Sequence, residues 1–136
     1  MLVVDASVAV KWVLPEADSD RALAVCARGV PLTAPSLLVE ETANVVWQRV
    51  RRGELTRDQA IDAARVAIGL VSTIVPVGNL YEDALRIAID LDHPVYDCFY
   101  IALALRDQAP LATADRKLSE LATKAGVLLD PWAMPP

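Results

Sequence analysis

The stretch that decides the fold is MLVVDASVAVKW, residues 1–12. A short apolar run, Leu2 to Val4, ends on Asp5, and Ser7 and an amphipathic segment follow at once. β-Branched residues favour a strand, and a short apolar run followed by a polar break is typical of a buried parallel strand. Open α/β sheets bind their ligands at the carboxyl ends of such strands. Because Asp is also a good helix N-cap, this stretch alone leaves Asp5 open between a helix cap and a site residue.

Apolar runs and helical periods alternate along the rest of the chain, which predicts a parallel sheet covered by helices. The expected strands are 2–4, 31–34, 73–77, 110–113 and a closing strand at 127–129. The expected helices are 6–14, 16–27, 36–52, 56–71, 80–91, 96–106 and 114–125. The sequence therefore predicts an α/β fold, with four to five short parallel strands flanked by about seven helices. We expect one domain over residues 1–136, with a core of 1–130 and an irregular tail at 131–136.

Local signals mark several of these boundaries. Ser36 follows a proline and should cap the long helix. Thr56, with Gln59 three residues later, has the pattern of a capping box. No strand separates the helices on either side of Gly53, which predicts an inserted helical hairpin. Pro76 cannot donate a ladder hydrogen bond, so the third strand should lie at an edge of the sheet.

Composition limits the possible functions. The chain has 136 residues, 54% of them hydrophobic, which is enough for a well-filled core and excludes disorder. Its formal net charge is −5, which argues against a protein that coats nucleic acid by bulk charge. An enzyme that holds a few phosphates through metal ions is still compatible with this charge, because bound cations reverse the sign of a carboxylate-lined site.

No targeting or membrane segment is apparent. No apolar run approaches the roughly 20 residues that span a bilayer, and MLVVDAS lacks the basic segment of a secretion signal. We therefore expect a cytoplasmic protein without membrane contact, in which Cys26 and Cys98 are reduced, buried thiols. The single histidine, His93, excludes a His-rich metal site.

Several acids fall where expected strands or helices begin and end. Asp5 and Asp115 share one arrangement, in which an apolar strand is followed by an acid and then a helix. If these two strands are neighbours where the sheet order reverses, both carboxylates open into one crevice. Asp97 begins a strongly apolar helix, and Glu40 and Glu41 lie in the first turns of the long helix.

Three or four carboxylates in one pocket repel one another, and a hard cation such as Mg²⁺ or Mn²⁺ would neutralise them. Such a site serves metal-assisted phosphodiester hydrolysis, in which a bound ion lowers the pKa of a water and stabilises the leaving oxygen. Each acid taken singly could also be a helix cap or a solvated side chain.

Four segments carry a family resemblance: VVDASVAVKW (3–12), APSLLVEETANVVW (34–47), YDCFYIALA (96–104) and LATADRKL (111–118). In order and spacing they closely resemble the PIN-domain ribonucleases, and most of all the VapC toxins of bacterial and archaeal toxin–antitoxin pairs. The resemblance extends from residue 1 to about residue 130. It implies a PIN-like three-layer fold and a Mg²⁺-dependent endoribonuclease, with Mn²⁺ as a possible substitute. It also implies a toxin that cleaves RNA, is neutralised by a VapB-like antitoxin and forms a homodimer.

The resemblance assigns four catalytic and metal-binding acids, which are Asp5, Glu41, Asp97 and Asp115. The family's glutamate stands three residues before an asparagine, and this spacing selects Glu41, with Asn44, rather than Glu40.

Ser7 and Thr113 match small hydroxyl positions beside the acids, where they would orient a carboxylate or a water. Helix capping and strand-end hydrogen bonding remain nearly equal alternatives for these two hydroxyls.

Other residues have weaker assignments. Lys11, Arg116 and Lys117 are candidates for contact with RNA phosphates, which position a substrate without reading its sequence. The resemblance offers Trp12 and Trp47 as antitoxin contacts, although core packing is their default role.

Further side chains have ordinary structural interpretations. The arginines that end the long helix (Arg49, Arg51 and Arg52) are expected to be solvated. The aromatic residues near Asp97 (Tyr96, Phe99 and Tyr100) are expected in the core or at a dimer contact.

Alternative functions remain within and outside the family. A PIN nuclease of RNA processing, or an inert antitoxin-binding PIN domain, would share these motifs. A phosphate-accepting receiver domain would need a second acid beside Asp5, and a haloacid-dehalogenase-type phosphatase would need Asp-x-Asp there; the sequence has neither. The motifs leave open which RNA is cut and whether one or two metal ions act.

Overall fold

The computed structural model describes residues 1–133. Its strands are β1 (Leu2–Val4), β2 (Leu32–Pro35), β3 (Thr73–Val75) and β4 (Leu111–Ala112). Its α-helices are α1 (Ala6–Ala9), α2 (Ser19–Ala27), α3 (Leu37–Arg51), α4 (Arg57–Gly69), α5 (Tyr81–Leu91), α6 (Val95–Asp107) and α7 (Arg116–Lys124). Short 3₁₀ turns are η1 (Val10–Trp12), η2 (Val77–Asn79) and η3 (Pro131–Ala133).

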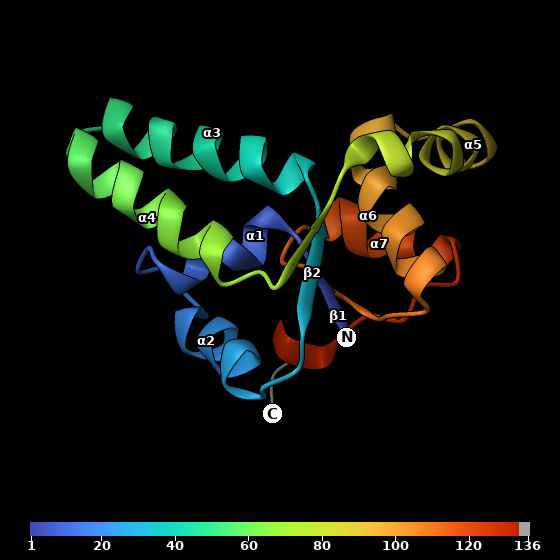
Figure 1. Cartoon of the computed structure of the whole chain (residues 1–136), viewed down its shortest axis with the longest axis horizontal. Coiled ribbons are helices and arrows are strands. Elements are labelled where there is room, and N and C mark those ends of the chain that lie inside the picture. The colour runs from blue at the N-terminus through green and yellow to red at the C-terminus, as the bar shows by residue number, and fades with distance from the viewer. Residues whose placement is uncertain (134–136) are drawn as a thin grey trace.

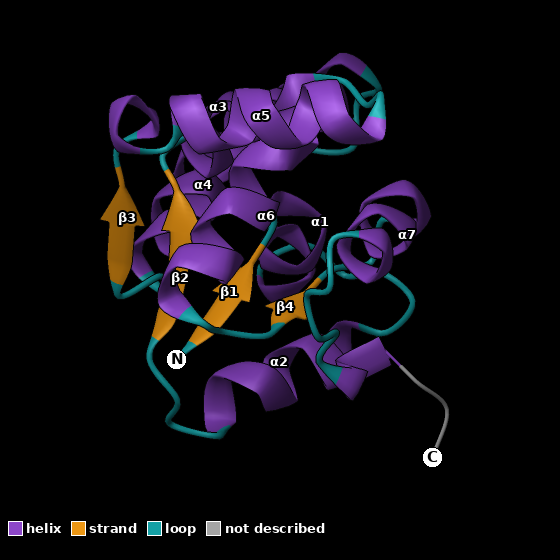
Figure 2. Cartoon of the chain, turned by 90° about the vertical axis from the view of Figure 1, so that its right-hand side faces the viewer, coloured by secondary structure: helices purple, strands orange, loops and turns teal. Residues whose placement is uncertain are grey.

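The four strands form one parallel sheet in the order β3-β2-β1-β4 (Figure 2). The chain builds β1, β2 and β3 outward in one direction and then returns to place β4 on the other side of β1. The strand order therefore reverses between β1 and β4, which is where open α/β sheets form their ligand crevice. The third strand lies at an edge of the sheet, as Pro76 predicts, but it ends at Val75 rather than at residue 77.

Helices cover both faces of the sheet (Figure 1). Val3 faces a core formed with α5, α6 and α7, whereas Leu2 and Val4 face a second core that includes Trp12 of η1 and Val25 of α2. Alternate side chains of a strand point to opposite faces, so a continuous apolar run is what a strand buried on both sides requires. The predicted α/β fold with three layers is confirmed.

The α3–α4 hairpin extends beyond the sheet and has a small core of its own (Figure 1). At the start of α4, the Thr56 hydroxyl accepts the Gln59 amide and the Gln59 side chain accepts the Thr56 amide, so the predicted capping box is present. Ser36 differs from its prediction. Its hydroxyl makes no capping bond to α3 and instead accepts the amide of Val77, beyond the end of β3.

Several predicted boundaries were wrong. The second helix begins at Ser19 rather than at residue 16, because the backbone of Asp18 is left-handed (φ 68°) and cannot belong to a right-handed helix. The last helix begins at Arg116 rather than Ala114, because Asp115 is its N-cap. The first helix completes one α-turn before it tightens to 3₁₀ geometry.

The predicted closing strand is a single bridge between Leu111 and Leu129. The tail is not irregular where it is described, because Pro131–Ala133 form a 3₁₀ turn and Trp132 is buried. Residues 134–136 of the predicted tail lie outside the described residues. No helix in the described part of the chain is both long enough and apolar enough to cross a membrane.

Candidate active site

Asp5 is both a helix cap and a member of a carboxylate pocket. It follows β1 directly and is the N-cap of α1. Its Oδ1 accepts hydrogen bonds from the Ser7 hydroxyl (2.6 Å) and the Val8 amide (3.2 Å), and its Oδ2 accepts one from the Thr113 hydroxyl (2.5 Å). Only 5% of the residue is exposed, and this burial raises the pKa of Asp5 to about 6, although the three hydrogen bonds lower it.

Asp115 occupies the equivalent place after β4. Its Oδ1 accepts the amides of Lys117 (2.8 Å) and Leu118 (3.3 Å), so it caps α7 as Asp5 caps α1. Because β1 pairs with β4, the two strand-end acids open on the same crevice. The conditional prediction that strands one and four are neighbours is therefore confirmed.

Glu41 enters the pocket from α3. Its Oε1 accepts a hydrogen bond of 2.6 Å from the hydroxyl of Tyr100, which is buried in α6. Burial raises the pKa of Glu41, and the nearby charges of Asp97 and Asp115 raise it further, whereas the Tyr100 bond lowers it. Burial, followed by the charge of Glu41, raises the pKa of Tyr100 well above its ordinary value, so the tyrosine remains a hydrogen-bond donor. Glu40 is exposed and does not line the pocket.

Asp97 lies in the first turn of α6. Its Oδ2 is 2.9 Å from Nε2 of His93, the residue before the helix-starting proline. Both side chains are partly buried. The histidine thus holds the one pocket acid that neither caps a helix nor bonds a hydroxyl.

The four acids line one pocket of about 320 Å³. Its lining residues are Asp5, Ala6, Ser7, Glu41, Asn44, Val45, Gln48, Asp97, Tyr100, Asp115 and Leu118. Among these residues none is basic, so the lining itself supplies no neutralising charge. In the arrangement described for residues 1–133, no three His, Cys, Asp or Glu side chains converge closely enough to hold a metal ion. Each carboxylate is instead held by a protein donor, and this all-oxygen donor set has the chemistry that Mg²⁺ or Mn²⁺ prefers.

Three residues were predicted to bind phosphate. Arg116 and Lys117 lie next to Asp115 in the chain, whereas Lys11 is turned to other partners. Lys11 is engaged by Glu16 (2.9 Å) and by the carbonyl of Ala17 (3.1 Å) and does not line the pocket, so its contact with substrate stays a prediction. Arg116 is exposed and pairs with Glu120. Lys117 is exposed and lines a neighbouring hollow with His93 and Asp97.

The two tryptophans offered as antitoxin contacts separate in the structure. Trp12 is only 7% exposed and its indole donates to the Ala22 carbonyl at 2.9 Å, so it has the core packing given as its default role, and its contact with an antitoxin stays a prediction. Trp47 is 53% exposed and stands over an apolar groove between α3 and α4. The guanidinium of Arg51 lies 5.6 Å from its ring centre.

The prediction that three arginines are solvated holds for two of them. Arg49 was expected to be solvated, but it pairs with Glu16 and with Glu54. Arg51 and Arg52 are exposed as expected.

Sequence reasoning missed three contributors to this region: Tyr100, His93 and Trp132. The hydroxyl of Tyr100 reaches an acid 59 positions away, and no local pattern reports such a distance. His93 stands four residues before Asp97, a separation that could have suggested the pair. Because Pro94 follows it, His93 was interpreted only as part of a turn. Trp132 was placed in the tail, although its indole donates to the carbonyl of Thr113.

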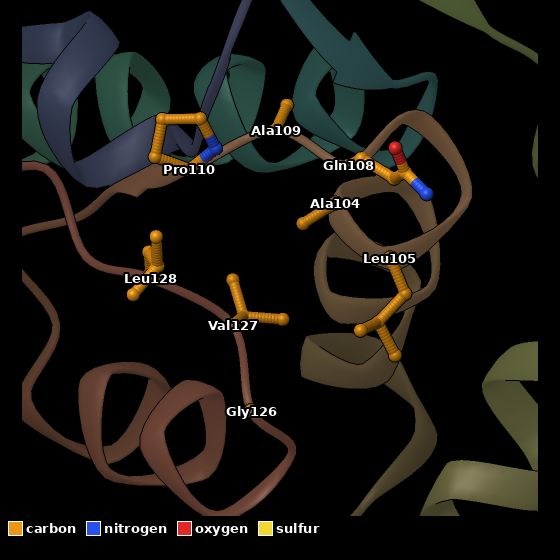
Figure 3. Close-up of a pocket in the computed structure, with 8 residues that line it drawn as sticks. All are labelled: Ala104, Leu105, Gln108, Ala109, Pro110, Gly126, Val127 and Leu128. Atoms are coloured by element: carbon orange, nitrogen blue, oxygen red, sulfur yellow. The ribbon is translucent and has the colours of Figure 1, made fainter.

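A second hollow lies at the other end of α6 (Figure 3). It is lined by Ala104, Leu105, Gln108, Ala109, Pro110, Gly126, Val127 and Leu128. None of these residues is ionisable, so this hollow offers no acid–base or metal chemistry. The two cysteines are free, as expected, with Cys98 buried and Cys26 partly buried.

Comparison with known proteins identifies the family. The model of the PIN domain family matches residues 2–124. Ribonuclease VapC3 of Pyrobaculum aerophilum is 31% identical over 121 residues, which cover 88% of this chain and 92% of the relative. Two solved structures share the fold. VapC20 of Mycobacterium tuberculosis, described as a sarcin-ricin loop cleaving toxin, matches with a TM-score of 0.71 and 18% identity over 88% of this chain and 94% of its own.

The second structure, FitAcB of Neisseria gonorrhoeae, matches with a TM-score of 0.69 and 18% identity over 98% of this chain and all of its own. At such identities the likeness supports the fold alone. The family model and the relative at 31% identity carry the assignment: this chain belongs to the PIN-domain family, as a homologue of the VapC ribonucleases.

Proposed function

We propose that this protein is a toxin endoribonuclease that hydrolyses RNA phosphodiester bonds with a carboxylate-bound divalent metal and is neutralised by a VapB-like antitoxin. One observation carries the proposal. Four acids line one pocket at the point where the strand order reverses: three lie at the starts of α1, α6 and α7, and the fourth lies in α3. The chain that carries them is related to a VapC ribonuclease.

Asp5, Glu41, Asp97 and Asp115 would hold the metal, with Mg²⁺ as the first candidate and Mn²⁺ as a substitute. When bound, the ion would activate a water and stabilise the charge that develops on phosphate oxygens. Burial is the main cause of the raised pKa values of Asp5 and Glu41, and repulsion from other pocket acids adds to it, so the charged form of each carboxylate carries an electrostatic penalty. A divalent ion would remove this penalty.

The protein's own contribution is to hold each acid in place. The Ser7 and Thr113 hydroxyls hold both oxygens of Asp5, Tyr100 holds Glu41, and His93 holds Asp97. Such outer contacts fix ligand orientation before a cation or substrate arrives. Asn44 and Gln48 line the same wall of α3 and could donate to a phosphate oxygen.

Arg116 and Lys117, exposed at the start of α7 beside Asp115, would contact RNA phosphates; their exposure and their closeness in sequence to a pocket acid support this role. Such contacts would position the strand without selecting its sequence.

The antitoxin would bind the α3–α4 hairpin. Ala43, Val46, Trp47, Val50, Arg57, Ala60, Ile61 and Ala64 line an apolar groove there. Grooves of this kind accept the apolar face of an amphipathic helix, with exposed aromatic residues as anchors. Support comes from the VapC relative and from the exposure of Trp47 and Ile61.

Homodimerisation would use α5. Tyr81, Leu85 and Ile89 recur at helical spacing on this helix and are exposed, as is the nearby Tyr96. A stripe of large apolar side chains on one helix face is more typical of an interface than of a solvated surface.

The proposal is tested by expressing the wild type and Asp5→Asn with and without the adjacent upstream reading frame, followed by mapping of new RNA 5′ ends. We expect new ends and growth arrest only from the wild type without the upstream frame. Asp58→Asn changes an exposed acid in the first turn of α4 and is the matched control, which should behave like the wild type. Equal cleavage by Asp5→Asn would refute the metallonuclease, and arrest regardless of the upstream frame would refute neutralisation by its product.

A further inference from the structure

The segment that ends the described chain packs beneath the carboxylate pocket. Trp132 of η3 is only 5% exposed and belongs to the core cluster that contains Leu2 and Val4 of β1 and Ala112 of β4. Its indole N–H donates to the main-chain carbonyl of Thr113 at 3.0 Å, in a buried hydrogen bond. A buried indole N–H needs such a partner, and this partner belongs to the loop between β4 and α7, which carries the pocket residue Asp115.

Both polar groups of the peptide unit between Thr113 and Ala114 are held from outside the loop. The carbonyl of Thr113 accepts the Trp132 indole, and the amide of Ala114 donates to the Ser7 hydroxyl at 2.8 Å. A peptide unit is planar, so hydrogen bonds at its two polar ends fix how the whole plane is turned.

The orientation of this plane sets the two strand-end acids. The hydroxyl of Thr113 donates to Asp5 (2.5 Å) and accepts the amide of Asp115 (2.9 Å). If the plane turned, Thr113 could not make both bonds, and the Asp5 and Asp115 carboxylates would shift relative to each other.

Trp132 is itself firmly anchored. Its amide donates to Asp130 at 3.0 Å, and the carboxylate of Asp130 binds the Arg28 guanidinium through two bonds of 2.6 and 3.1 Å. The amide of Asp130 donates to the carbonyl of Leu111 in β4 at 2.8 Å. Segment 130–132 is therefore tied to both α2 and β4, and it can act as a rigid support.

We propose that Trp132 is a positioning residue of the carboxylate centre, which acts through the Thr113–Ala114 peptide. The inference rests on the proposed metallonuclease function, since positioning matters only if Asp5 and Asp115 act together on a cation.

The test compares Trp132→Phe with Trp12→Phe. Each variant keeps an aromatic ring in the same core cluster and removes one buried indole donor to a main-chain carbonyl. The carbonyl that Trp12 holds belongs to Ala22 of α2, away from the acids. Two properties are measured on the full chain: Mn²⁺ affinity, from the electron paramagnetic resonance signal of free Mn²⁺, and the NMR shifts of the Ala114 and Asp115 amides in EDTA.

For Trp132→Phe we expect about tenfold weaker Mn²⁺ binding, as for other outer contacts of metal ligands, and displaced amide signals of both residues. Trp12→Phe should match the wild type in both measurements even if its thermal stability falls. Equal effects in the two variants, or no effect of Trp132→Phe, would overturn the proposal.

Asp130→Asn provides a second variant that leaves the core intact and loosens the anchor of Trp132. It should displace the same amides in the same direction, and unmoved signals would contradict the inference. Asp5→Asn separates this inference from the proposed function. If that variant binds Mn²⁺ as the wild type does, the metallonuclease itself fails; if it loses binding while Trp132→Phe does not, only the positioning role fails.

Discussion

At the scale of single residues, Asp5 illustrates why a cap and a site residue need not be alternatives. The Oδ1 atom caps α1 through the Val8 amide, and Oδ2 is held by Thr113 from across the sheet. Asp115 likewise caps α7 after β4, through the amides of Lys117 and Leu118. Local sequence favours both acids as caps, and only the pairing of β1 with β4 makes them neighbours.

The buried carboxyl of Asp5 should make the stability of the metal-free protein depend on pH. Its pKa is about 6 in the folded protein and 3.8 ordinarily, so the folded state binds this proton more tightly. In EDTA, its contribution to the free energy of unfolding is greatest below about pH 4, falls as pH rises, and levels off above about pH 6. A shift of this size corresponds to roughly 2–3 kcal/mol.

Asp5→Asn removes this titration. The free energy of unfolding, measured by urea denaturation, should therefore rise for the variant relative to the wild type by roughly 2 kcal/mol between about pH 4 and pH 7. The amide of the variant also makes poorer hydrogen bonds than the carboxyl, but this loss of stability is the same at every pH and does not affect the change with pH. A constant difference between variant and wild type across this range would contradict a raised pKa of Asp5.

Glu40 and Glu41 offer a direct comparison of adjacent residues. Glu41→Gln should reduce RNA cleavage by at least about 100-fold, because it removes a proposed metal ligand that Tyr100 orients. Glu40→Gln should leave cleavage unchanged, because Glu40 is exposed and outside the pocket. Rates measured on one RNA at saturating Mg²⁺ decide the matter, and the opposite order of effects would reassign the acid.

At the scale of elements, the α3–α4 hairpin is an insertion between β2 and β3 that carries one acid of the site. Glu41 lies near the start of α3, whereas the groove with Trp47 lies farther along the hairpin. One helix thus joins the candidate catalytic pocket to the candidate partner surface. Val46 and Ala60 of the hairpin pack with Val10 and Leu14 in a cluster distinct from the two clusters on the sheet, so we expect the stability of the hairpin to be separable from that of the sheet.

The capping box of α4 tests this separation. Thr56→Ala removes the hydroxyl that accepts the Gln59 amide and should lower the free energy of unfolding by about 1 kcal/mol. Amide hydrogen exchange should quicken first in α4, while RNA cleavage should stay at the wild-type rate because Thr56 does not line the pocket. If the variant is fully folded in the assay and still loses cleavage, the hairpin and the site are coupled.

At the scale of the whole molecule, we expect the four carboxylates that line one pocket to make the protein's stability depend on cations. A ligand that binds only the folded state stabilises it by about 2.7 kcal/mol at a hundred times its Kd. The melting temperature should therefore rise when EDTA is replaced by Mg²⁺ or Mn²⁺. Asp97→Asn should lose most of this rise, whereas Asp58→Asn, an exposed acid on α4, should keep it. Equal rises in all three proteins would indicate binding of the ion elsewhere.

Much of the architecture follows from local sequence. Apolar runs that end in acids, helical periods, Pro76 and the Thr56–Gln59 pair determined the strands, the edge position of β3, the hairpin and its cap. They did so because hydrogen-bond capacity and side-chain periodicity act over a few residues. One boundary failed because Asp18 adopts a left-handed backbone just before α2, a conformation that the helical pattern of residues 16–27 did not reveal.

The candidate site divides in the same way. Residue type and position at strand and helix ends, together with the family motifs, single out Asp5, Glu41, Asp97 and Asp115, and the structure brings these four acids into one pocket. Only the tertiary structure decided what holds them: Tyr100 on Glu41, His93 on Asp97 and Trp132 beneath Thr113. It also buried Trp12 and exposed Trp47. The physical reason is that these outcomes depend on packing between segments far apart in the chain, which no local periodicity encodes.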